Sequence, residues 1–334
     1  MKLTIKDIAR LAEVSTATVS MILNNKDGNI SAVTREKVLR IVKENNYIPN
    51  TMARSLVTRK TKTIGLVIPD IANPFFPELA RGAEDKASEA GYSIIYCNTD
   101  DDLEKEEKYI NMLAEKMVDG IVFTHSAKRT GELSPIDRGT IPVILIDRDM
   151  ESSNVKGKVL VNNLEGAYKG VKHLIDKGHK KIAFITGALT SNTAKDRLAG
   201  YKIALEENGL EYHANYVRAG QYKTEWGLTA IKQLLEEGIS FDAVFCGNDL
   251  IAISVIKALK SKGYRIPTDI AVVGFDDIYM ASVVEPGLTT VKQPNYEMGY
   301  KAVELLIEVL ERPEKEIEKK KIILDTELII RSST

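Results

Sequence analysis

Two different spacings of apolar residues divide the chain. Over the first 48 residues, apolar side chains recur three or four positions apart, as on one face of an α-helix, at Ile8, Ala9, Leu11 and Ala12, then Val19, Ile22 and Leu23, then Val38, Leu39 and Val42. From Lys62 onward, short apolar runs alternate with longer amphipathic stretches, which is the pattern of strands and helices in turn. The spacing predicts a small helical module followed by an α/β domain.

Polar residues mark the limits of the predicted helices in the first module. Thr4 and Asp7 have the spacing of a capping box, with Asp in place of the usual Glu, so the first helix is predicted to begin there. Ser15 is placed to cap a second helix that runs to about Asn24, and Ser31 to cap a third. Three short helices with a tight turn between the first two are typical of a helix-turn-helix module.

The remaining chain is predicted to form parallel sheets with helices on both faces. The expected strands are Thr63 to Pro69, Tyr92 to Asn98, Gly120 to Thr124, Val143 to Asp147, Lys181 to Thr186, Ala243 to Gly247 and Ile270 to Phe275. So long a segment exceeds one comfortable sheet, and a second strand–helix series begins near Lys181, so two similar lobes are predicted.

Composition is that of an ordinary globular protein, with 44% hydrophobic and 28% charged residues among 334. No apolar run approaches the length of a bilayer-crossing helix, and no secretory signal opens the sequence, so we expect a cytoplasmic protein without a membrane partner. The two cysteines, Cys97 and Cys246, lie in separate apolar runs and the four histidines occur singly. Neither a disulfide framework, a metal site nor a cofactor is predicted.

Charge is distributed unevenly along the chain. Residues 1–62 hold 12 Lys or Arg against 5 Asp or Glu, a net of +7, whereas the rest carries 34 against 42, a net of −8. A basic module indicates a polyanionic partner, because Lys and Arg release counterions condensed on phosphates. A merely solvated basic face is the alternative that charge alone leaves open.

Five segments closely resemble the lactose/galactose repressor family, and the match is specific: Ile5–Ala9, Val14–Ser20, Thr34–Val38, Asn46–Asn50 and Ala53–Leu56. The resemblance, which extends over essentially the whole chain, implies a transcription regulator, most simply a repressor, that binds operator DNA as a homodimer. The DNA-binding residues that it implies are Thr4, Ser15, Thr16, Ala17, Thr18, Met21, Asn24, Arg35, Tyr47, Arg54 and Leu56.

In that family the second helix lies in the major groove, so Thr16, Ala17 and Met21 are expected to face base edges, while Ser15, Asn24, Arg35 and Tyr47 hold phosphates or orient the module. Met21 departs from familiar members, which often carry Arg or His there, and methionine cannot make a bidentate contact to guanine. For Thr16 and Thr18 the alternative role is helix-cap chemistry.

The domain boundaries also follow the resemblance. Residues 1–48 are the helix-turn-helix headpiece, and 49–62 a hinge helix and linker, in which Leu56 is expected to wedge between base pairs in the minor groove. A plain linker, with Leu56 packed on the following domain, is the alternative. Residues 63–334 are the effector-binding and dimerisation domain, similar to type I periplasmic binding proteins, with an N-lobe of about 63–162 and 292–323 and a C-lobe of about 163–291 and 324–334.

Polar residues cluster where the predicted strands end, which is where ligands bind in open α/β sheets. Amide, carboxylate, guanidinium and aromatic groups suit the hydroxyls and C–H faces of a sugar, although any one of these residues could instead serve a turn, a cap or an ion pair. The expected effector-binding residues are Asn73, Phe75, Phe76, Asp147, Arg148, Arg197, Tyr222, Asn248, Asp276 and Gln293. All of them also resemble those of ribose-binding proteins except Tyr222, which replaces a phenylalanine.

This resemblance favours ribose as the effector. Ser191 stands where purine-binding repressors carry an arginine, which opposes a purine, while another sugar, a sugar phosphate or a protein coregulator remains an alternative. An α/β enzyme is opposed because no glycine-rich nucleotide motif follows a strand, and a secreted sugar-binding protein because no signal precedes the headpiece.

Overall fold

The computed structural model describes residues 3–48, 60–129, 141–150, 155–311 and 320–334. The chain divides into two compact units, Met1–Thr61 and Lys62–Thr334. Arg54 and Leu56, the predicted hinge residues, lie outside the described residues.

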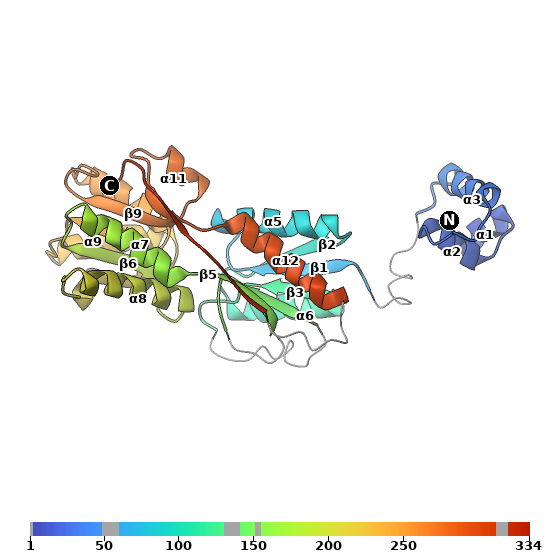
Figure 1. Ribbon diagram of the computed structural model, residues 1–334, viewed down its shortest axis with the longest axis horizontal. Coiled ribbons are helices and arrows are strands. Elements are labelled where there is room, and N and C mark those ends of the chain that lie inside the picture. The colour runs from blue at the N-terminus through green and yellow to red at the C-terminus, as the bar shows by residue number, and fades with distance from the viewer. Residues whose placement is uncertain (1–2, 49–59, 130–140, 151–154, 312–319) are drawn as a thin grey trace. The chain divides into compact units, whose positions relative to one another are not determined.

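The first unit contains three helices, α1 Ile5–Ala12, α2 Thr16–Leu23 and α3 Ala32–Glu44 (Figure 1). The predicted caps are confirmed: Thr4 and Asp7 form the capping box, and the Ser15 and Ser31 side chains accept hydrogen bonds from Thr18 N and Thr34 N. Glu13, in the turn between α1 and α2, has φ 57°, so the chain reverses there in the left-handed region.

The headpiece core is smaller than the apolar pattern predicted. Ile8, Ala12, Val19, Ile22 and Val38 are buried between the three helices, together with Ala9. Leu11 and Leu39, by contrast, are 48% and 37% exposed. A module of this size has room for one apolar row per helix, so the neighbouring positions face solvent.

The second unit consists of two lobes, each built on a six-stranded sheet (Figure 1). The N-lobe sheet is parallel throughout, in the order β11-β5-β4-β3-β1-β2, with β1 Thr63–Ile68, β2 Ser93–Asn98, β3 Gly120–Phe123, β4 Val143–Ile146, β5 Val155–Val161 and β11 Lys320–Leu324. Its faces are covered by α5 Phe75–Glu89 with α12 Asn295–Glu311, and by α6 Leu103–Glu115.

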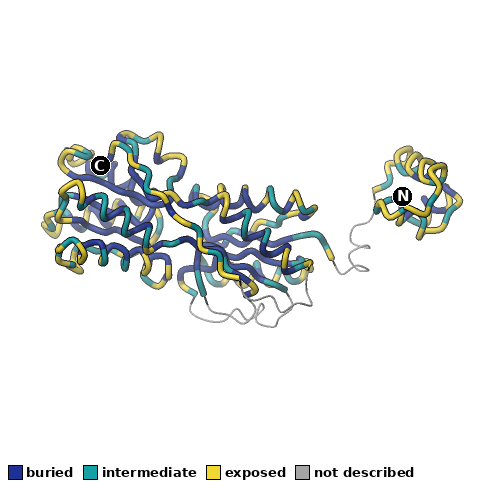
Figure 2. Tube along the Cα trace, viewed as in Figure 1, coloured by how far each residue is buried: buried dark blue, intermediate teal, exposed yellow. Residues whose placement is uncertain are grey.

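The C-lobe sheet has the order β12-β10-β9-β8-β6-β7, and only β12 is antiparallel to its neighbour. The strands are β6 Ile182–Gly187, β7 Val217–Gly220, β8 Ala243–Cys246, β9 Ala271–Asp276, β10 Thr289–Lys292 and β12 Glu327–Ile329. One face is covered by α7 Asn163–Asp176 and α8 Asn192–Glu207, the other by α9 Thr224–Glu236 and α10 Asp249–Ser261. The short η1 Ala214–Tyr216 and α11 Tyr279–Val283 complete the lobe. Buried residues run through the sheets and the inner helix faces of both lobes (Figure 2).

The chain passes between the lobes three times. It leaves the N-lobe after β5, returns after β10 into α12, and leaves again between β11 and β12. Because a cleft between two lobes opens or closes about such connections, the ends of the strands beside them are the natural place for a ligand.

Each predicted strand is present to within one residue at either end, but five strands escaped prediction: β5, β7, β10, β11 and β12. All five lie at or beside a sheet edge, and they include charged or exposed side chains such as Lys156 and Lys158 in β5 and Lys320 and Lys321 in β11. Their apolar pattern is correspondingly weak. None of the helices in the described ranges is long and apolar enough to cross a membrane.

Candidate functional site

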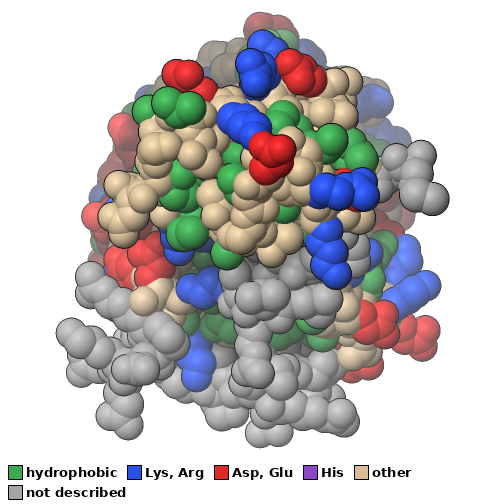
Figure 3. Space-filling model, turned by 90° about the vertical axis from the view of Figure 1, so that its right-hand side faces the viewer, with side chains coloured by type: hydrophobic (Ala, Val, Ile, Leu, Met, Phe, Trp, Pro, Cys, Tyr) green, Lys and Arg blue, Asp and Glu red, His purple; other side chains and the backbone are tan. Residues whose placement is uncertain are grey.

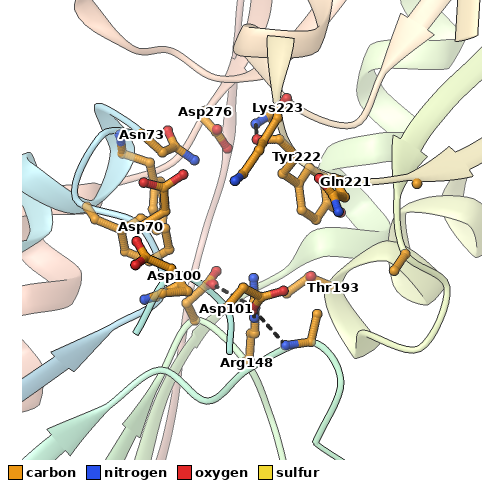
Figure 4. Close-up of a pocket in the computed structure, with 18 of the residues that line it drawn as sticks. Asp70, Asn73, Asp100, Asp101, Arg148, Thr193, Gln221, Tyr222, Lys223 and Asp276 are labelled. Carbon is orange, nitrogen blue, oxygen red and sulfur yellow. Dashed lines mark hydrogen bonds and ion pairs between the residues drawn. The ribbon is translucent and has the colours of Figure 1, made fainter. Parts of the chain in front are cut away.

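A cavity of about 390 Å³ lies between the two lobes, at the carboxyl ends of their strands. All ten residues proposed from the sequence line it: Asn73, Phe75, Phe76, Asp147, Arg148, Arg197, Tyr222, Asn248, Asp276 and Gln293. In Figure 4, Asn73 and Asp70 face Tyr222 and Gln221 across the cavity. Its volume is in the range that small-molecule sites occupy, about 300–1,000 Å³.

Strand ends account for most of this convergence. Asp147 and Arg148 follow β4, Asn248 follows β8, Asp276 ends β9 and Gln293 follows β10. Because parallel strands point their carboxyl ends to the same edge, residues far apart in sequence meet at one opening.

Arg197 is held by its surroundings before any ligand arrives. Its Nε donates to Asn163 Oδ1 at 2.8 Å and its Nη1 to the carbonyl oxygen of Gly247. The guanidinium carbon lies 3.7 Å from the centre of the Phe275 ring, and the residue is only 3% exposed. No described residue accepts a hydrogen bond from Nη2, so this rigid group offers a donor to a ligand.

Asp276 and Gln293 form a buried acceptor pair on the C-lobe side. Gln293 Nε2 donates to Asp276 Oδ1 at 2.7 Å, and Gln293 Oε1 is buried without a hydrogen-bond partner among the described residues. A buried polar atom without a partner costs free energy. A ligand hydroxyl that donates to Gln293 Oε1 would remove that cost.

Two of the carboxyls that line the pocket, those of Asp147 and Asp276, are desolvated. Burial raises the pKa of Asp276 to about 7, although Arg197 and the bond from Gln293 act against it. Burial also raises the pKa of Asp147, opposed by Arg148 and Arg197. Both residues have positive φ angles, 68° for Asp147 and 118° for Asp276. Backbone strain of this kind concentrates at ligand sites.

Arg148 is anchored on the N-lobe side. Its Nη1 donates to Asp101 Oδ1 at 2.7 Å, a bond visible in Figure 4, and to the carbonyl oxygen of His125 at 2.8 Å. The guanidinium is therefore fixed by the loops that follow β2 and β3.

Two asparagines combine a local role with a place in the lining. Asn248 Oδ1 caps α10 by accepting from Ile251 N at 3.0 Å, and Asn73 Oδ1 accepts from Phe75 N at 3.1 Å. The turn and cap roles considered from the sequence are therefore real, and they hold each amide beside the cavity. The Phe75 and Phe76 rings meet edge to face with centres 4.9 Å apart, which gives the cavity an apolar wall.

Pro69 and Asp70, which follow the first predicted strand, also line the cavity. Sequence reasoning missed the other lining residues: Asp100, Asp101, Ala127, Lys128, Ala188, Thr193, Gly220, Gln221 and Lys223. Asp100, Asp101 and Lys128 follow predicted strands, so the strand-end rule could have found them. Gln221 and Lys223 follow β7, a strand that was not predicted. Ser191 does not line the cavity; its hydroxyl bonds to that of Thr193 at 2.6 Å.

In the headpiece, α2 presents an exposed face that carries both polar and apolar side chains. Thr16 and Ala17 are exposed and Met21 is 40% exposed, whereas Val19 and Ile22 are buried. On the face of the molecule shown in Figure 3, Lys and Arg side chains are interspersed with uncharged polar and hydrophobic atoms.

Several predicted phosphate-binding side chains have partners within the headpiece. The Thr18 and Ser15 hydroxyls lie 2.9 Å apart, in keeping with a cap role for Thr18. Arg35 Nε donates to Asp27 Oδ2 at 2.5 Å, so Arg35 braces the loop before α3. Asn24 Nδ2 donates to Ser20 O at 2.7 Å, and the half-buried Tyr47 packs on the headpiece core. Thr4 is exposed at the start of α1.

The parts of the chain that the structure describes hold no group of three or more side chains able to bind a metal ion. Cys97 and Cys246 are both buried and unpaired with one another.

Family models match nearly the whole chain. One, described as bacterial regulatory proteins of the lacI family, matches residues 4–50. The other, described as periplasmic binding proteins and sugar binding domain of LacI family, matches residues 61–331.

Curated relatives with this chain's full architecture are transcription regulators. The HTH-type transcriptional regulator RegA of Clostridium saccharobutylicum is 41% identical and covers 100% of both chains. The ribose operon repressor of Halalkalibacterium halodurans is 39% identical over 99% of this chain and 97% of its own. The HTH-type transcriptional repressor PurR of Vibrio atlanticus is 40% identical over 99% and 98%. Because these identities are so similar, overall identity does not indicate which of these relatives this chain resembles most in its effector.

Solved structures agree with the fold. The lac repressor dimer bound to operator and the anti-inducer ONPF has a TM-score of 0.87 at 27% identity and covers 100% of this chain and 99% of that one. A LacI family transcriptional regulator from Enterococcus faecium with bound ribose has a TM-score of 0.72 at 29% identity, over 81% and 98%.

Proposed function

The chain belongs to the LacI family of bacterial transcription regulators, and from that premise we propose that ribose is the effector which controls its operator binding. The protein is a DNA-binding regulator that responds to a sugar, and its matched relatives are regulators rather than enzymes. The choice of ribose rests on the pocket.

One observation carries the proposal: a buried set of fixed hydrogen-bonding groups surrounds an opening of sugar size. Arg197 supplies a rigid donor, Asp147 and Asp276 supply acceptors, and Gln293 Oε1 is an acceptor still without a partner. Adjacent hydroxyls of a sugar donate and accept together, which matches such paired groups. The Phe75 and Phe76 rings provide an apolar surface for the C–H face of the sugar ring.

Ribose is favoured over other sugars by the similarity of nine of the ten residues to those of ribose-binding proteins; the tenth, Tyr222, stands in place of a phenylalanine. A relative named for the ribose operon and a solved structure with bound ribose support the same choice. The absence of an arginine at Ser191, whose hydroxyl is engaged by Thr193, opposes a purine.

We propose linkage between the two sites as the mechanism. Ribose bridges residues of both lobes, so it binds the closed arrangement more tightly than the open one. Closure changes how the N-lobes of a dimer face each other, and thereby the operator affinity of the headpieces.

The proposed DNA contacts centre on α2. Thr16, Ala17 and Met21 are the exposed residues that would meet base edges, with Met21 offering apolar contact rather than a bidentate hydrogen bond. Ser15, Arg35 and Tyr47 would position the headpiece on phosphates. Two headpieces are needed because a symmetric operator has two half-sites.

Calorimetric titration of the full chain with ribose and a panel of other sugars tests the effector. Arg197→Ala and Asp147→Ala are each expected to weaken ribose binding by at least about tenfold, since each removes a charged hydrogen-bonding group. Lys195→Ala, at an exposed position on the same helix as Arg197, is the matched control and should leave the affinity unchanged. Tighter binding of another sugar, or unchanged affinity in the two pocket variants, would contradict the assignment.

Gel shift at moderate salt with candidate operator fragments, with and without ribose, tests the regulatory role. Sequence-selective binding that ribose shifts in either direction is the expected result. Binding without any sequence preference would contradict it.

A further inference from the structure

A carboxylate that does not line the cavity is fully buried in the N-lobe beneath it. Glu106, on the first turn of α6, is 0% exposed. Burial raises the pKa of Glu106, and the charge of Arg129 opposes that rise. A buried ion pair is seldom more stabilising than apolar residues of the same volume, because both ions lose their hydration. A role other than stability therefore accounts better for this pair.

Glu106 holds the loop that follows β3. Its Oε2 accepts a hydrogen bond from Ser126 N at 2.5 Å, and its Oε1 pairs with Arg129 Nε. Arg129 also lies 3.6 Å from Glu107, which is exposed and has no contact with Ser126. The buried carboxylate thus secures both sides of Ala127 and Lys128, which line the cavity.

The same loop determines where Asp101 lies. Ser126 Oγ donates to Asp101 O at 2.9 Å, and Ala127 N donates to Asp101 Oδ1 at 2.9 Å. That carboxylate oxygen also accepts from Arg148 Nη1 at 2.7 Å. Hydrogen bonds therefore run without a break from Glu106, through Ser126 and Asp101, to the guanidinium of Arg148.

A second route reaches Arg148 from the same loop. Arg148 Nη1 donates to His125 O at 2.8 Å, and His125 directly precedes the residue that Glu106 binds. These two acceptors of Nη1, Asp101 Oδ1 and His125 O, consequently depend on the conformation of residues 125–127. The residue directly after Arg148, Asp149, accepts through its carbonyl oxygen from Asn192 Nδ2 of the C-lobe at 2.8 Å.

We propose that Glu106 is a positioning residue for the effector site, which acts through the loop of residues 125–129 and Asp101 to fix the Arg148 guanidinium. The proposal rests on the cleft being the effector site. The proposal predicts that the Glu106 carboxylate contributes to sugar affinity although it does not line the cavity. It also predicts that this contribution depends on Arg148.

The test compares Glu106→Gln with Glu107→Gln in the full chain. The two residues are neighbours on α6 and share Arg129, but only Glu106 holds the loop, so Glu107→Gln is the matched control. Calorimetry with ribose should show a loss of at least about fivefold in affinity for Glu106→Gln and none for Glu107→Gln. Operator binding without sugar should be the same for both.

Two further measurements separate positioning from general destabilisation. The first is a double-mutant cycle with Arg148→Lys. The loss of ribose affinity in the double variant should be well below the sum of the losses in Glu106→Gln and Arg148→Lys, because both substitutions act on the same contact. Hydrogen exchange of residues 124–129 without sugar should be faster in Glu106→Gln and unchanged in Glu107→Gln.

Should Glu106→Gln fail to fold, Ser126→Ala serves instead. It removes the two hydrogen bonds of the hydroxyl, to Asp101 O and from Lys128 N, and leaves the buried pair of Glu106 and Arg129 intact. A loss of about threefold in ribose affinity is expected. Normal affinity in the folded variants, additive losses in the cycle, or an equal effect of Glu107→Gln would overturn the proposal. If the wild-type protein bound no sugar at all, that result would contradict the proposed function itself, and the positioning role of Glu106 would be contradicted as a consequence.

Discussion

At the scale of single residues, burial determines the chemistry of the cleft. Asp147 and Asp276 are ordinary aspartates in the sequence, but in the fold they are 8% and 4% exposed and face Arg197. Desolvation disfavours their charged forms, while the guanidinium favours them. A ligand that donates hydroxyl hydrogen bonds can therefore bring these carboxyls into the fully ionised state.

Ribose affinity is predicted to fall with decreasing pH. A sugar hydroxyl donates to the ionised form of Asp276, whose pKa is raised to about 7, so below that pH the carboxyl must first lose a proton. Between pH 8 and pH 6 the affinity should fall about tenfold. Titration calorimetry at both pH values, in buffers of different ionisation enthalpy, should show proton release on binding at pH 6. Asp276→Asn should bind weakly with a much smaller pH dependence, and an affinity independent of pH in the wild type would contradict the argument.

At the scale of elements, short polar side chains and glycines set how helices begin and how closely they pack. Ser15 and Ser31 cap α2 and α3. On the other unit, Gly82 of α5 and Gly299 of α12 let two helices approach, since a Cβ at Gly299 would lie 1.8 Å from Leu79 O and one at Gly82 would lie 2.0 Å from Tyr296 O. Neither contact could be relieved by a side-chain rotation, because both involve backbone.

Ser15→Ala is predicted to weaken operator binding while ribose binding stays unchanged. It removes the bond from Thr18 N and destabilises the headpiece by about 1 kcal/mol. Ser31→Ala removes the equivalent cap of α3, at a residue outside the proposed DNA contacts, and is the control. Gel shift well below the unfolding temperature should show the greater loss for Ser15→Ala; equal losses would mean that the cap acts only through stability.

Gly299→Ala is predicted to destabilise the N-lobe by about 1–3 kcal/mol, because α5 and α12 must separate. The measurement is thermal unfolding followed by circular dichroism. Gly287→Ala is a suitable control in the same unit, since its nearest neighbours are 3.4 Å or more from the added carbon. A Gly299→Ala protein as stable as the wild type would contradict this prediction, because it would show that α5 and α12 can move apart without loss of stability.

At the scale of the whole molecule, two units that fold separately must act together. The dimer that we propose for operator binding needs an apolar surface, and α11 presents one: Tyr279 is 80% exposed and Val283 is 62% exposed. Large apolar side chains so exposed on one short helix indicate a protein contact.

Val283→Asp is therefore predicted to shift the protein toward monomers and to weaken operator binding more than tenfold, because two half-sites would no longer be bound by one linked pair. Ribose affinity should change little. Sedimentation velocity and gel shift are the measurements, and Met117→Asp, a 52% exposed apolar position in the N-lobe, is the control. If the Val283→Asp protein remained a dimer, α11 would not be part of the dimer interface.

Some helices and strands could be predicted from the sequence and others could not, for physical reasons. The helices of the headpiece and the central strands were predictable because their caps and apolar spacing are local. The strands β5, β7, β10, β11 and β12 were not, because they are short or carry lysines, and neighbouring strands rather than their own residues specify them. The exposure of Leu11 and Leu39 likewise depends on how three helices share a small core.

The sequence by itself determined the fold class, the headpiece and, through strand ends and resemblance, ten residues of the cavity lining. Only the tertiary structure decided that Thr193, Gln221 and Lys223 join that lining, and that Glu106 holds the loop that contacts Arg148. The structure also decided that Thr18 binds the cap of its own helix. Local pattern encodes which residues form an element and where it ends. Burial, and with it the charge state and the hydrogen-bond partners of each polar group, arises when elements distant in the chain pack together.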